Sequence, residues 1–284
     1  MLFGMVPALL DDVLEAIGRS ALEPVALDGG WTNRNYRVGD LVVRLPGADT
    51  AVLGIDRVAE RAATEQAAAA GVGPEVVAFV HGCLVTRFLP GEPLDGDGVR
   101  AHLPEVADAL RRVHAGPELP AAFSGLCVVE AYSDAAGAVP DDYHRAHALA
   151  ERIEALPRDV VPCHHDLVPE NLLWDGHSVR ILDWEYAGMG DRFFDLGNLA
   201  VNAGLDDAAV LEAYFGTVTP ATLARLRLMR LMADFREAMW GVLQAKVSDL
   251  DEDFAGYARE HFDRLNAAMD AAPIDEWLTD AACP

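Results

Sequence analysis

The sequence contains a single lysine, Lys246, and little that would mark a secreted or membrane protein. Its four cysteines form no C-x-x-C pair and no metal-finger spacing, which indicates reduced thiols in a reducing compartment. No stretch approaches the roughly 20 apolar residues that a membrane span needs. The apolar first ten residues carry no basic charge and run into Asp11 and Asp12, unlike a signal peptide. We therefore expect a cytoplasmic protein with no membrane partner.

Basic residues as a class are also scarce. The 46 acidic and 22 basic side chains give a formal net charge of −24 at pH 7. Such a surface repels phosphate backbones and anionic lipid, which argues against a nucleic-acid partner and favours a cationic small molecule. The charge equally suits solubility or a salt-rich or GC-rich source, and the sequence does not separate these explanations. It does not indicate the oligomeric state either.

The composition is otherwise that of a globular protein, with 284 residues of which 51% are hydrophobic and 24% charged. At about 150 residues per domain, this length predicts two domains or two lobes of one. Runs rich in branched residues predict strands at 23–27, 34–38, 41–45, 75–80 and 84–88, with one Ala-rich helix at 55–70. Residues 90–93, Pro-Gly-Glu-Pro, are typical of a linker.

Beyond the linker the pattern is mainly helical, and we expect helices at 99–114, 141–155, 193–203, 208–215, 220–247 and 253–269. Two short apolar runs, 172–174 and 179–182, interrupt this pattern and flank a turn, which predicts a β-hairpin. The sequence therefore predicts an α+β protein with two lobes. The small lobe, residues 1–89, has one helix in an antiparallel sheet, and the larger lobe, residues 90–284, is mainly helical.

The most informative segment is 164–171, His-His-Asp-Leu-Val-Pro-Glu-Asn. Asn171 enters the predicted hairpin and Asp183 leaves it on the neighbouring strand, so these side chains meet at its open end. An amide oxygen beside a carboxylate is a donor set that suits Mg²⁺, which also keeps waters and substrate phosphates as ligands. Asp166 supplies a separate carboxylate. Turn and capping roles explain most chance occurrences of such a motif, but the hairpin and the second acid favour a functional site.

Phosphoryl transfer needs these parts: a carboxylate that accepts a hydroxyl proton, ligands for Mg²⁺, and a cation on the nucleotide phosphates. The spacing H-x-D-x-x-x-x-N is that of the kinase catalytic loop, and Asp183 stands where the metal-binding Asp of D-F-G would fall. We therefore predict Asp166 as the general base and Asn171 and Asp183 as Mg²⁺ ligands.

In the small lobe the turn 28–35 can cover phosphates with backbone N–H groups and the Thr32 hydroxyl, although a plain surface turn also fits it. Because the one lysine lies in the helical lobe, Arg44 is the candidate cation. An arginine in an apolar strand needs a partner, and Glu60 in the next helix is the first candidate. Glu65 is the alternative, turned well away from Glu60 on the same helix. The plainer interpretation is an exposed edge strand with Arg44 unpaired.

Taken together, these residues resemble those of the choline/ethanolamine kinases, within the wider group of aminoglycoside phosphotransferase-like small-molecule kinases. The resemblance rests on stretches that follow in family order along most of the chain: 29–30, 32–38, 43–47, 71–75, 164–171, 183–186, 194–198 and 240–248. The last of them, Trp-Gly-Val-Leu-Gln-Ala-Lys-Val-Ser, favours choline/ethanolamine kinases over their aminoglycoside relatives.

The resemblance implies a bilobal protein-kinase-like fold with ATP in the cleft beside residues 86–89. It implies that the nucleotide is bound by Thr32, Asn33, Asn35, Arg44, Glu60, Arg87 and Leu89. It agrees with Asp166 as the base and with Asn171 and Asp183 on Mg²⁺. It makes Asp195 a structural anchor, whose carboxylate accepts hydrogen bonds from the backbone of the catalytic loop.

For the acceptor, the resemblance implies aromatic faces and carboxylates around a cation, because the ring quadrupole attracts a cation that cannot donate hydrogen bonds. Trp240 and Tyr257 stand at the aromatic positions and Glu185 near the acceptor, although both aromatics could pack in the core instead. A second aromatic, expected three residues before Trp240, is Glu237, which suits a primary or less substituted amine better than choline. The predicted acceptor is a small cationic amino alcohol, with choline and ethanolamine unresolved.

Two alternatives stay open. One is a kinase of the same fold that acts on thiamine, an amino sugar or an aminoglycoside. The other is a non-catalytic module that binds a nucleotide or a cation, against which the joint presence of Asp166, Asn171 and Asp183 counts.

Overall fold

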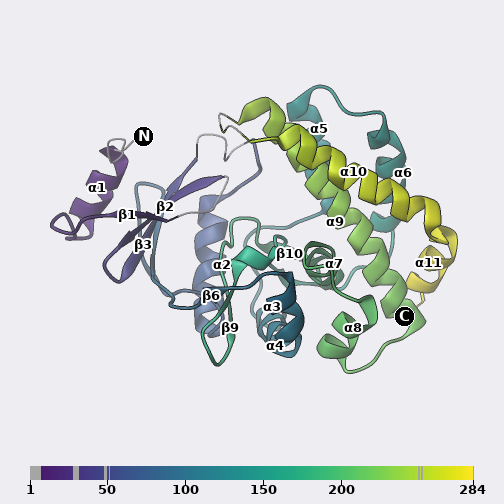
Figure 1. Ribbon diagram of the computed structural model, residues 1–284, viewed down its shortest axis with the longest axis horizontal. Coiled ribbons are helices and arrows are strands. Elements are labelled where there is room, and N and C mark those ends of the chain that lie inside the picture. The colour runs from purple at the N-terminus through teal and green to yellow at the C-terminus, as the bar shows by residue number, and fades with distance from the viewer. Residues whose placement is uncertain are drawn as a thin grey trace.

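The computed structural model describes residues 8–27, 32–47, 50, 52–248, 250 and 252–283. Figure 1 shows a small lobe that holds the N-terminal sheet and a larger, mainly helical lobe that holds the C-terminus. The α+β organisation expected from the sequence is confirmed.

The small lobe is a five-stranded antiparallel sheet. In spatial order its strands are β1 (Val25–Leu27), β2 (Asn33–Val38), β3 (Leu41–Pro46), β5 (Cys83–Arg87) and β4 (Val76–Val80). Gly39 has a left-handed φ of 64° in the tight turn between β2 and β3, where a side chain would be strained. Helix α1 (Ala8–Ala16) packs on the sheet through Leu10 and Val13, which are fully buried. The central strand β3 carries Arg44.

Helix α2 (Arg57–Ala69) connects β3 to β4 and confirms the helix predicted at 55–70. One carboxylate oxygen of Asp56 accepts from two backbone N–H groups of the first turn, at 2.8 and 3.2 Å, and so caps the helix. The chain leaves the helix through Gly71, whose φ of 72° is left-handed. The apolar face of α2 turns inward, and Glu60 lies on that face with only 1% of its surface exposed.

The larger lobe is organised around the 28-residue helix α9 (Pro220–Val247), which has the bounds predicted from the sequence. Thr219 and Thr222 form a capping box at its start, where Pro220 loses no hydrogen bond. The other helices are α3 (Gly96–Ala101), α4 (Leu103–His114), α5 (Gly125–Ala136), α6 (Asp142–Glu154), α7 (Arg192–Asn202), α8 (Asp207–Phe215), α10 (Phe254–Ala271) and α11 (Ile274–Ala281). Figure 1 shows α9 and α10 side by side, and α5, α7 and α11 also pack on α9. Among the described helices, none is long and apolar enough to cross a bilayer.

Two small sheets interrupt the helices. β8 (Leu172–Trp174) and β9 (Val179–Ile181) pair as the predicted hairpin, and β6 (Glu92–Pro93) adds a third strand beside β8. The segment predicted as a linker therefore also forms a short strand. β7 (Val160–Cys163) pairs with β10 (Gly188–Asp191) in the second sheet.

Three features differ from the sequence predictions. The helix expected at 99–114 is divided into α3 and α4, because His102 leaves helical geometry and Pro104 begins a new first turn, where its missing N–H is not needed. The helices α5 and α11 and the strand β7 have no predicted counterpart. Neither has β10, whose sequence Gly-Met-Gly-Asp contains no branched residue; Gly190 is required there because a Cβ would lie 2.1 Å from Nε2 of His165.

Candidate active site

The loop between β7 and the short 3-10 turn η1 (Pro169–Asn171) carries the predicted base. The carboxylate of Asp195, on α7, accepts hydrogen bonds from the backbone N–H groups of His164 (2.8 Å) and His165 (2.7 Å). Burial raises the pKa of Asp195, but the hydrogen bond from His114 and the nearby imidazoles outweigh burial and hold this pKa at about 2. An ionised acid thus fixes the loop, and the anchoring contact implied for Asp195 is confirmed.

Two residues of the site have strained backbones. His165 and Asp183 have φ values of 66° and 63°, in the left-handed region that residues other than glycine seldom adopt. The ring of His165 stacks on Phe123 with centroids 3.8 Å apart. Such strain persists only where the surroundings over-determine the conformation, and it concentrates at functional sites. The fold therefore holds both the neighbour of Asp166 and the predicted metal ligand Asp183 in fixed positions.

The β8–β9 hairpin brings Asn171 and Asp183 to its open end, as the sequence predicts. The N–H of Leu182 donates to the carbonyl of Asn171 at 2.8 Å, which joins the two segments just outside the strands. Nδ2 of Asn171 donates to the carbonyl of Asp166 at 2.9 Å, which turns the amide oxygen away from the loop. An amide oxygen and a carboxylate in this position are hard donors of the kind that Mg²⁺ binds. The residues fit the ion, and its binding here stays a prediction.

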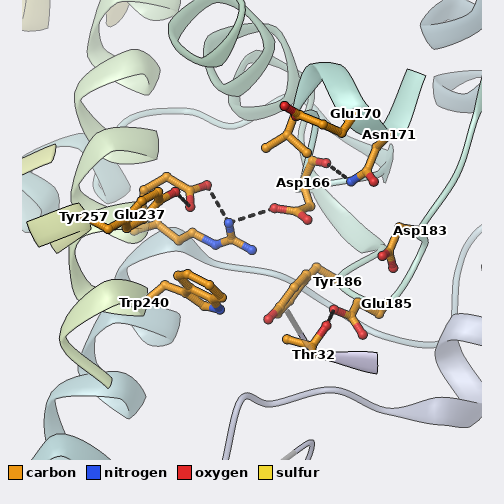
Figure 2. Close-up of a pocket in the computed structure, with 12 residues that line it drawn as sticks. Thr32, Asp166, Glu170, Asn171, Asp183, Glu185, Tyr186, Glu237, Trp240 and Tyr257 are labelled. Carbon is orange, nitrogen blue, oxygen red and sulfur yellow. Dashed lines mark hydrogen bonds and ion pairs between the residues drawn. The ribbon is translucent and has the colours of Figure 1, made fainter. Parts of the chain in front are cut away.

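Two cavities meet at these residues. The first, of about 400 Å³, lies against the loop that carries Asp166, α9 and α10, and we call it the helix-side cavity. The second, of about 580 Å³, lies under the small-lobe sheet, and we call it the sheet-side cavity. Glu170, Asn171 and Asp183 line both. Figure 2 shows the helix-side cavity, with Asn171 and Asp183 on one side and Trp240 and Tyr257 on the other.

Asp166 lies in the wall of the helix-side cavity, with 19% of its side chain exposed. Its Oδ1 accepts a hydrogen bond from Nη1 of Arg236 at 2.9 Å. Burial raises the pKa of Asp166 to about 6, and the charge of Arg236 opposes this rise. A partly exposed carboxylate with such a pKa can accept a proton from a bound hydroxyl near neutral pH.

Five charged side chains connect the two lobes, and we call them the cross-lobe cluster: Arg44, Arg57, Glu60, Asp183 and Glu185. Nη1 of Arg44 donates to Oε1 of Glu60 at 2.7 Å and to Oδ1 of Asp183 at 2.6 Å. Nη1 of Arg57 donates to Oε2 of Glu60 at 2.7 Å and to Oε2 of Glu185 at 3.2 Å. The chain of pairs thus begins and ends on the segment that follows β9.

The predicted pairing of Arg44 with Glu60 is confirmed. The alternative partner, Glu65, lies on the outer face of α2 and pairs with Arg61 instead, at 2.8 Å. Burial alone lowers the pKa of Arg44, but the carboxylates of Asp183 and Glu60 outweigh burial and raise it above its ordinary value. Arg44 therefore stays charged and borders the sheet-side cavity, where a role on nucleotide phosphates stays a prediction.

Thr32 and Asn33 hold Glu185 from the small lobe. Oγ1 of Thr32 donates to Oε1 of Glu185 at 2.7 Å, as Figure 2 shows, and Nδ2 of Asn33 donates to Oε2 at 2.8 Å. Burial and the nearby Asp183 raise the pKa of Glu185 to about 7. Thr32 lines the helix-side cavity, and the buried Asn33 accepts from Nη2 of Arg57 at 2.6 Å. The structure places the side chains of Thr32 and Asn33 on Glu185 and not in the sheet-side cavity. It therefore does not support their predicted contact with a nucleotide.

The other residues predicted to bind nucleotide line the sheet-side cavity: Asn35, Arg44, Glu60, Arg87 and Leu89. Oδ1 of Asn35 is buried and has no hydrogen-bond partner within the described part of the chain, so it is an acceptor that a ligand donor could satisfy. Arg87 lies toward the surface, where its guanidinium pairs with Asp40. The turn that contains Gly29 and Gly30 lies outside the described residues.

Helices α9 and α10 supply the far wall of the helix-side cavity. The rings of Trp240 and Tyr257 meet edge to face, with centroids 5.6 Å apart. Glu237 accepts from Nη1 of Arg236 at 2.6 Å through Oε1 and from the Tyr257 hydroxyl at 3.0 Å through Oε2. We call Asp166, Arg236, Glu237 and Tyr257 the base-side cluster, most of which Figure 2 labels. All four residues predicted to bind the acceptor, Glu185, Glu237, Trp240 and Tyr257, line this cavity, and their contact with an acceptor stays a prediction.

Sequence reasoning misses Arg57, Arg236 and Tyr186. Arg57 and Arg236 donate to predicted site residues, and Tyr186 lines the helix-side cavity. Arg236 has the clearest signal, because it comes directly before the predicted Glu237 in the middle of a long helix, and the structure leaves it only 1% exposed. Arg57 lies three residues before Glu60, a spacing that puts both on one face of a helix. The ring of Tyr186 lies beneath Arg236, with the guanidinium carbon 4.6 Å from its centroid.

Comparison with known proteins agrees with this geometry. The model of the phosphotransferase enzyme family matches residues 23–229. Protein LicA of Haemophilus influenzae is 26% identical over 280 residues, covering 88% of this chain and 81% of that protein. Streptomycin 3''-kinase of Streptomyces griseus is 33% identical over 189 residues, covering 56% of this chain and 68% of that protein.

A crystal structure of a choline/ethanolamine kinase family protein from Mesorhizobium loti superposes with a TM-score of 0.81 at 29% identity, covering 95% of this chain and 100% of that one. The likeness confirms the kinase-like fold that the sequence predicts. The family match spans most of the chain and includes the catalytic loop, the hairpin and Arg44. The chain therefore belongs to the phosphotransferase enzyme family, and its expected class, a small-molecule kinase, is confirmed.

Proposed function

We propose that this phosphotransferase transfers the γ-phosphoryl group of ATP, with Mg²⁺, to the hydroxyl of a small cationic amino alcohol such as choline or ethanolamine. One observation carries the proposal: Asn171 and Asp183 line both cavities. A nucleotide in the sheet-side cavity and an alcohol in the helix-side cavity would meet at this shared wall. Mg²⁺ bound by these two residues would neutralise phosphate charge there.

The chain's own groups then have separate tasks. Asp166 accepts the proton of the acceptor hydroxyl while the hydroxyl oxygen forms a bond to the γ-phosphorus. The bond from that phosphorus to the β–γ bridging oxygen breaks, and ADP leaves. Arg44, charged and adjacent to Asp183, holds the phosphates from the small lobe. Catalysis of this kind depends on position and charge, which the fixed loop and the hairpin provide.

The charge and size of the helix-side cavity support a small cationic acceptor. Its acidic lining residues are Asp166, Glu170, Asp183, Glu185 and Glu237, against Arg236 as the basic one. Trp240 and Tyr257 add aromatic faces, which attract cations. The volume of about 400 Å³ lies near the lower end of the range for small-molecule sites, which favours a compact acceptor.

An amino sugar or aminoglycoside is the second candidate acceptor. The 33% identity to a streptomycin kinase favours it, since streptomycin also presents hydroxyls beside cationic groups. The small cavity volume argues against so large a molecule as acceptor unless the lobes move apart. The choice between the two candidates therefore needs a direct measurement.

The test is a coupled ADP-release assay with ATP and Mg²⁺ over a panel of choline, ethanolamine, thiamine, glucosamine and streptomycin, with phosphorylated products confirmed by mass spectrometry. We expect acceptor-dependent ADP release with an amino alcohol at more than tenfold higher kcat/KM than with the other compounds. Transfer to streptomycin or glucosamine with neither amino alcohol accepted would contradict the proposed substrate. ATP binding without transfer to any alcohol would support a non-catalytic module instead.

A further inference from the structure

The base-side cluster contains an arginine in an unusual position. Arg236 extends from α9 to the predicted base, and its side chain is only 2% exposed. One nitrogen, Nη1, donates both to Oδ1 of Asp166 at 2.9 Å and to Oε1 of Glu237 at 2.6 Å. The guanidinium lies over the ring of Tyr186, 4.6 Å from its centroid. A single cation thus stands between two carboxylates that both line the cavity, and the side chain of Asp166 is the more exposed of the two, 19% against 4% for Glu237.

Glu237 is occupied on both oxygens. Oε1 accepts from Arg236 and, at 3.4 Å, from Nδ2 of Asn198, and Oε2 accepts from the Tyr257 hydroxyl at 3.0 Å. Asn198 in turn accepts, through Oδ1, from the backbone N–H of Leu167, the residue that follows the base. These bonds close a ring from the catalytic loop through α7 and α9 back to Asp166. Glu237 is therefore bound into the protein and is only 3% exposed, which leaves little of it for a bound cation.

The remaining donors of Arg236 show that stability alone does not explain its position. Nε and Nη2 are buried and have no hydrogen-bond partner within the described part of the chain. Buried donors without partners are costly, and a site chosen for stability would satisfy them. An arginine also stays charged at every pH of interest, unlike lysine or histidine. A permanent charge retained at such a cost, next to the base, indicates a functional task.

We infer that Arg236 is a positioning residue, which holds one oxygen of Asp166 and leaves the other for the acceptor hydroxyl. Glu237 is then the counter-ion of Arg236 and not a ligand of the acceptor's cation. This inference rests on the proposed function. The geometry supports both parts, because one guanidinium nitrogen serves both carboxylates. Glu237 balances the charge that this arrangement puts into the wall.

The kinetic test compares R236M, R236K and E237Q with the wild type, using whichever acceptor of the panel is turned over best. R230M is the matched control, since Arg230 lies on the same helix and pairs with Asp207 outside the site. A positioned general base contributes about 10²–10⁴-fold, so R236M is expected to lose about 10²-fold in kcat with KM for ATP within threefold. R236K keeps a charge and is expected to recover about tenfold of that loss. R230M is expected to keep kcat within twofold.

E237Q separates the two roles of Glu237. As a counter-ion, Glu237 is not needed for acceptor binding, so the acceptor KM is expected to stay within threefold while kcat falls by less than tenfold. A ligand of the cation would instead show a rise in acceptor KM of tenfold or more, with KM for ATP unchanged. That rise, or a kcat for R236M within threefold of wild type, would overturn the inference while the proposed function stands.

If the protein phosphorylates no alcohol, both the proposed function and the positioning role of Arg236 are wrong. The pairing of Arg236 with Glu237 can then still be tested by thermal unfolding. R236M leaves Glu237 buried without a counter-ion, so its melting temperature is expected to fall. Adding E237Q to R236M is expected to raise that temperature again, because the uncompensated charge is removed. A double variant less stable than R236M alone would show that Glu237 does not serve as the counter-ion of Arg236.

Discussion

The cross-lobe cluster and the base-side cluster both pair arginine with carboxylates, but the first connects the two lobes and the second connects elements of the larger lobe. The cross-lobe cluster takes Arg44 and Arg57 from β3 and α2 and pairs them with Asp183 and Glu185 beyond β9. The base-side cluster lies wholly in the larger lobe. Movement between the lobes would stretch the first set of pairs and leave the second unchanged.

The two clusters therefore serve different parts of the site. The cross-lobe cluster joins Arg44, the predicted phosphate-binding residue, to Asp183, the predicted metal ligand, and to Glu185 in the wall of the helix-side cavity. A substitution at one of these residues is therefore expected to shift the others. The base-side cluster holds Asp166 independently of the small lobe, because its contacts run through α7, α9 and α10. Variants of the first are therefore expected to affect the binding of both substrates, and variants of the second the chemical step.

The largest expected effect comes from the predicted base, Asp166. Asp166→Asn keeps the shape of the side chain and a hydrogen-bond acceptor for Arg236 but removes the proton acceptor. We expect kcat to fall by about 10²–10⁴-fold, because general-base help is worth that much, while the dissociation constant for ATP with Mg²⁺ stays within threefold. Steady-state kinetics and isothermal titration calorimetry measure the two quantities. An equal loss of nucleotide affinity would mean that the base-side cluster does not act separately from the nucleotide site.

The predicted metal ligand in the cross-lobe cluster, Asp183, is expected to behave in the opposite way. Asp183→Asn removes a charge that pairs with Arg44 and that we predict to bind Mg²⁺. It is expected to raise the Mg²⁺ concentration for half-maximal activity by more than about tenfold, since even hydrogen-bond partners of metal ligands are worth 10–100-fold. Titration of MgCl₂ at fixed ATP measures it, with Asp175→Asn, at the far end of the hairpin, as the control. A loss of kcat at saturating Mg²⁺ with an unchanged Mg²⁺ requirement would contradict the assignment.

The contacts within one segment are the part of this site that sequence patterns predict well. The hairpin follows from two short apolar runs around a turn in which Asp175 accepts from the N–H groups of His177 and Ser178. The register then puts Asn171 opposite Leu182, the residue before Asp183, at the open end of the hairpin. The start of the long helix α9 is marked by a capping box of Thr219 and Thr222 and by Pro220 in the first turn.

Contacts between distant segments are the part that escapes prediction. Thr32 lies 153 residues from Glu185, and Arg236 lies 70 residues from Asp166, so no local spacing relates them. A polar residue such as Thr32 fits a phosphate-binding turn and a wall contact equally well until the lobes are placed. The strand β10 escapes for a different reason: its backbone pairs through glycines, which carry no strand propensity.

The buried pairs of the cross-lobe cluster are expected to stabilise the fold. Arg57→Met leaves Glu60 and Glu185, 1% and 3% exposed, without one of their cations. Loss of one partner of a buried pair costs about 3–5 kcal/mol, so we expect a loss of that order in the free energy of unfolding, with KM raised for both substrates. Arg61→Met is the matched control on the same helix, because its pair with Glu65 is exposed and worth below about 1 kcal/mol. Equal losses in the two variants, measured by urea unfolding, would show that the cross-lobe pairs carry no special stability.

The smallest expected effect concerns a residue outside both clusters, and it asks whether rings or carboxylates recognise the acceptor's cation. Trp240→Leu keeps an apolar side chain in the cavity wall and removes the aromatic face. A cation–π contact is worth about 0.5–2 kcal/mol, depending on its exposure to water, so we expect the acceptor KM to rise by about tenfold while KM for ATP changes by less than twofold. Trp277→Leu is the control, since that ring lies on α11 over Arg227, outside the site. An unchanged acceptor KM in Trp240→Leu would assign Trp240 to packing against Phe254 and Tyr257 and leave the cavity carboxylates as the groups that select the cation.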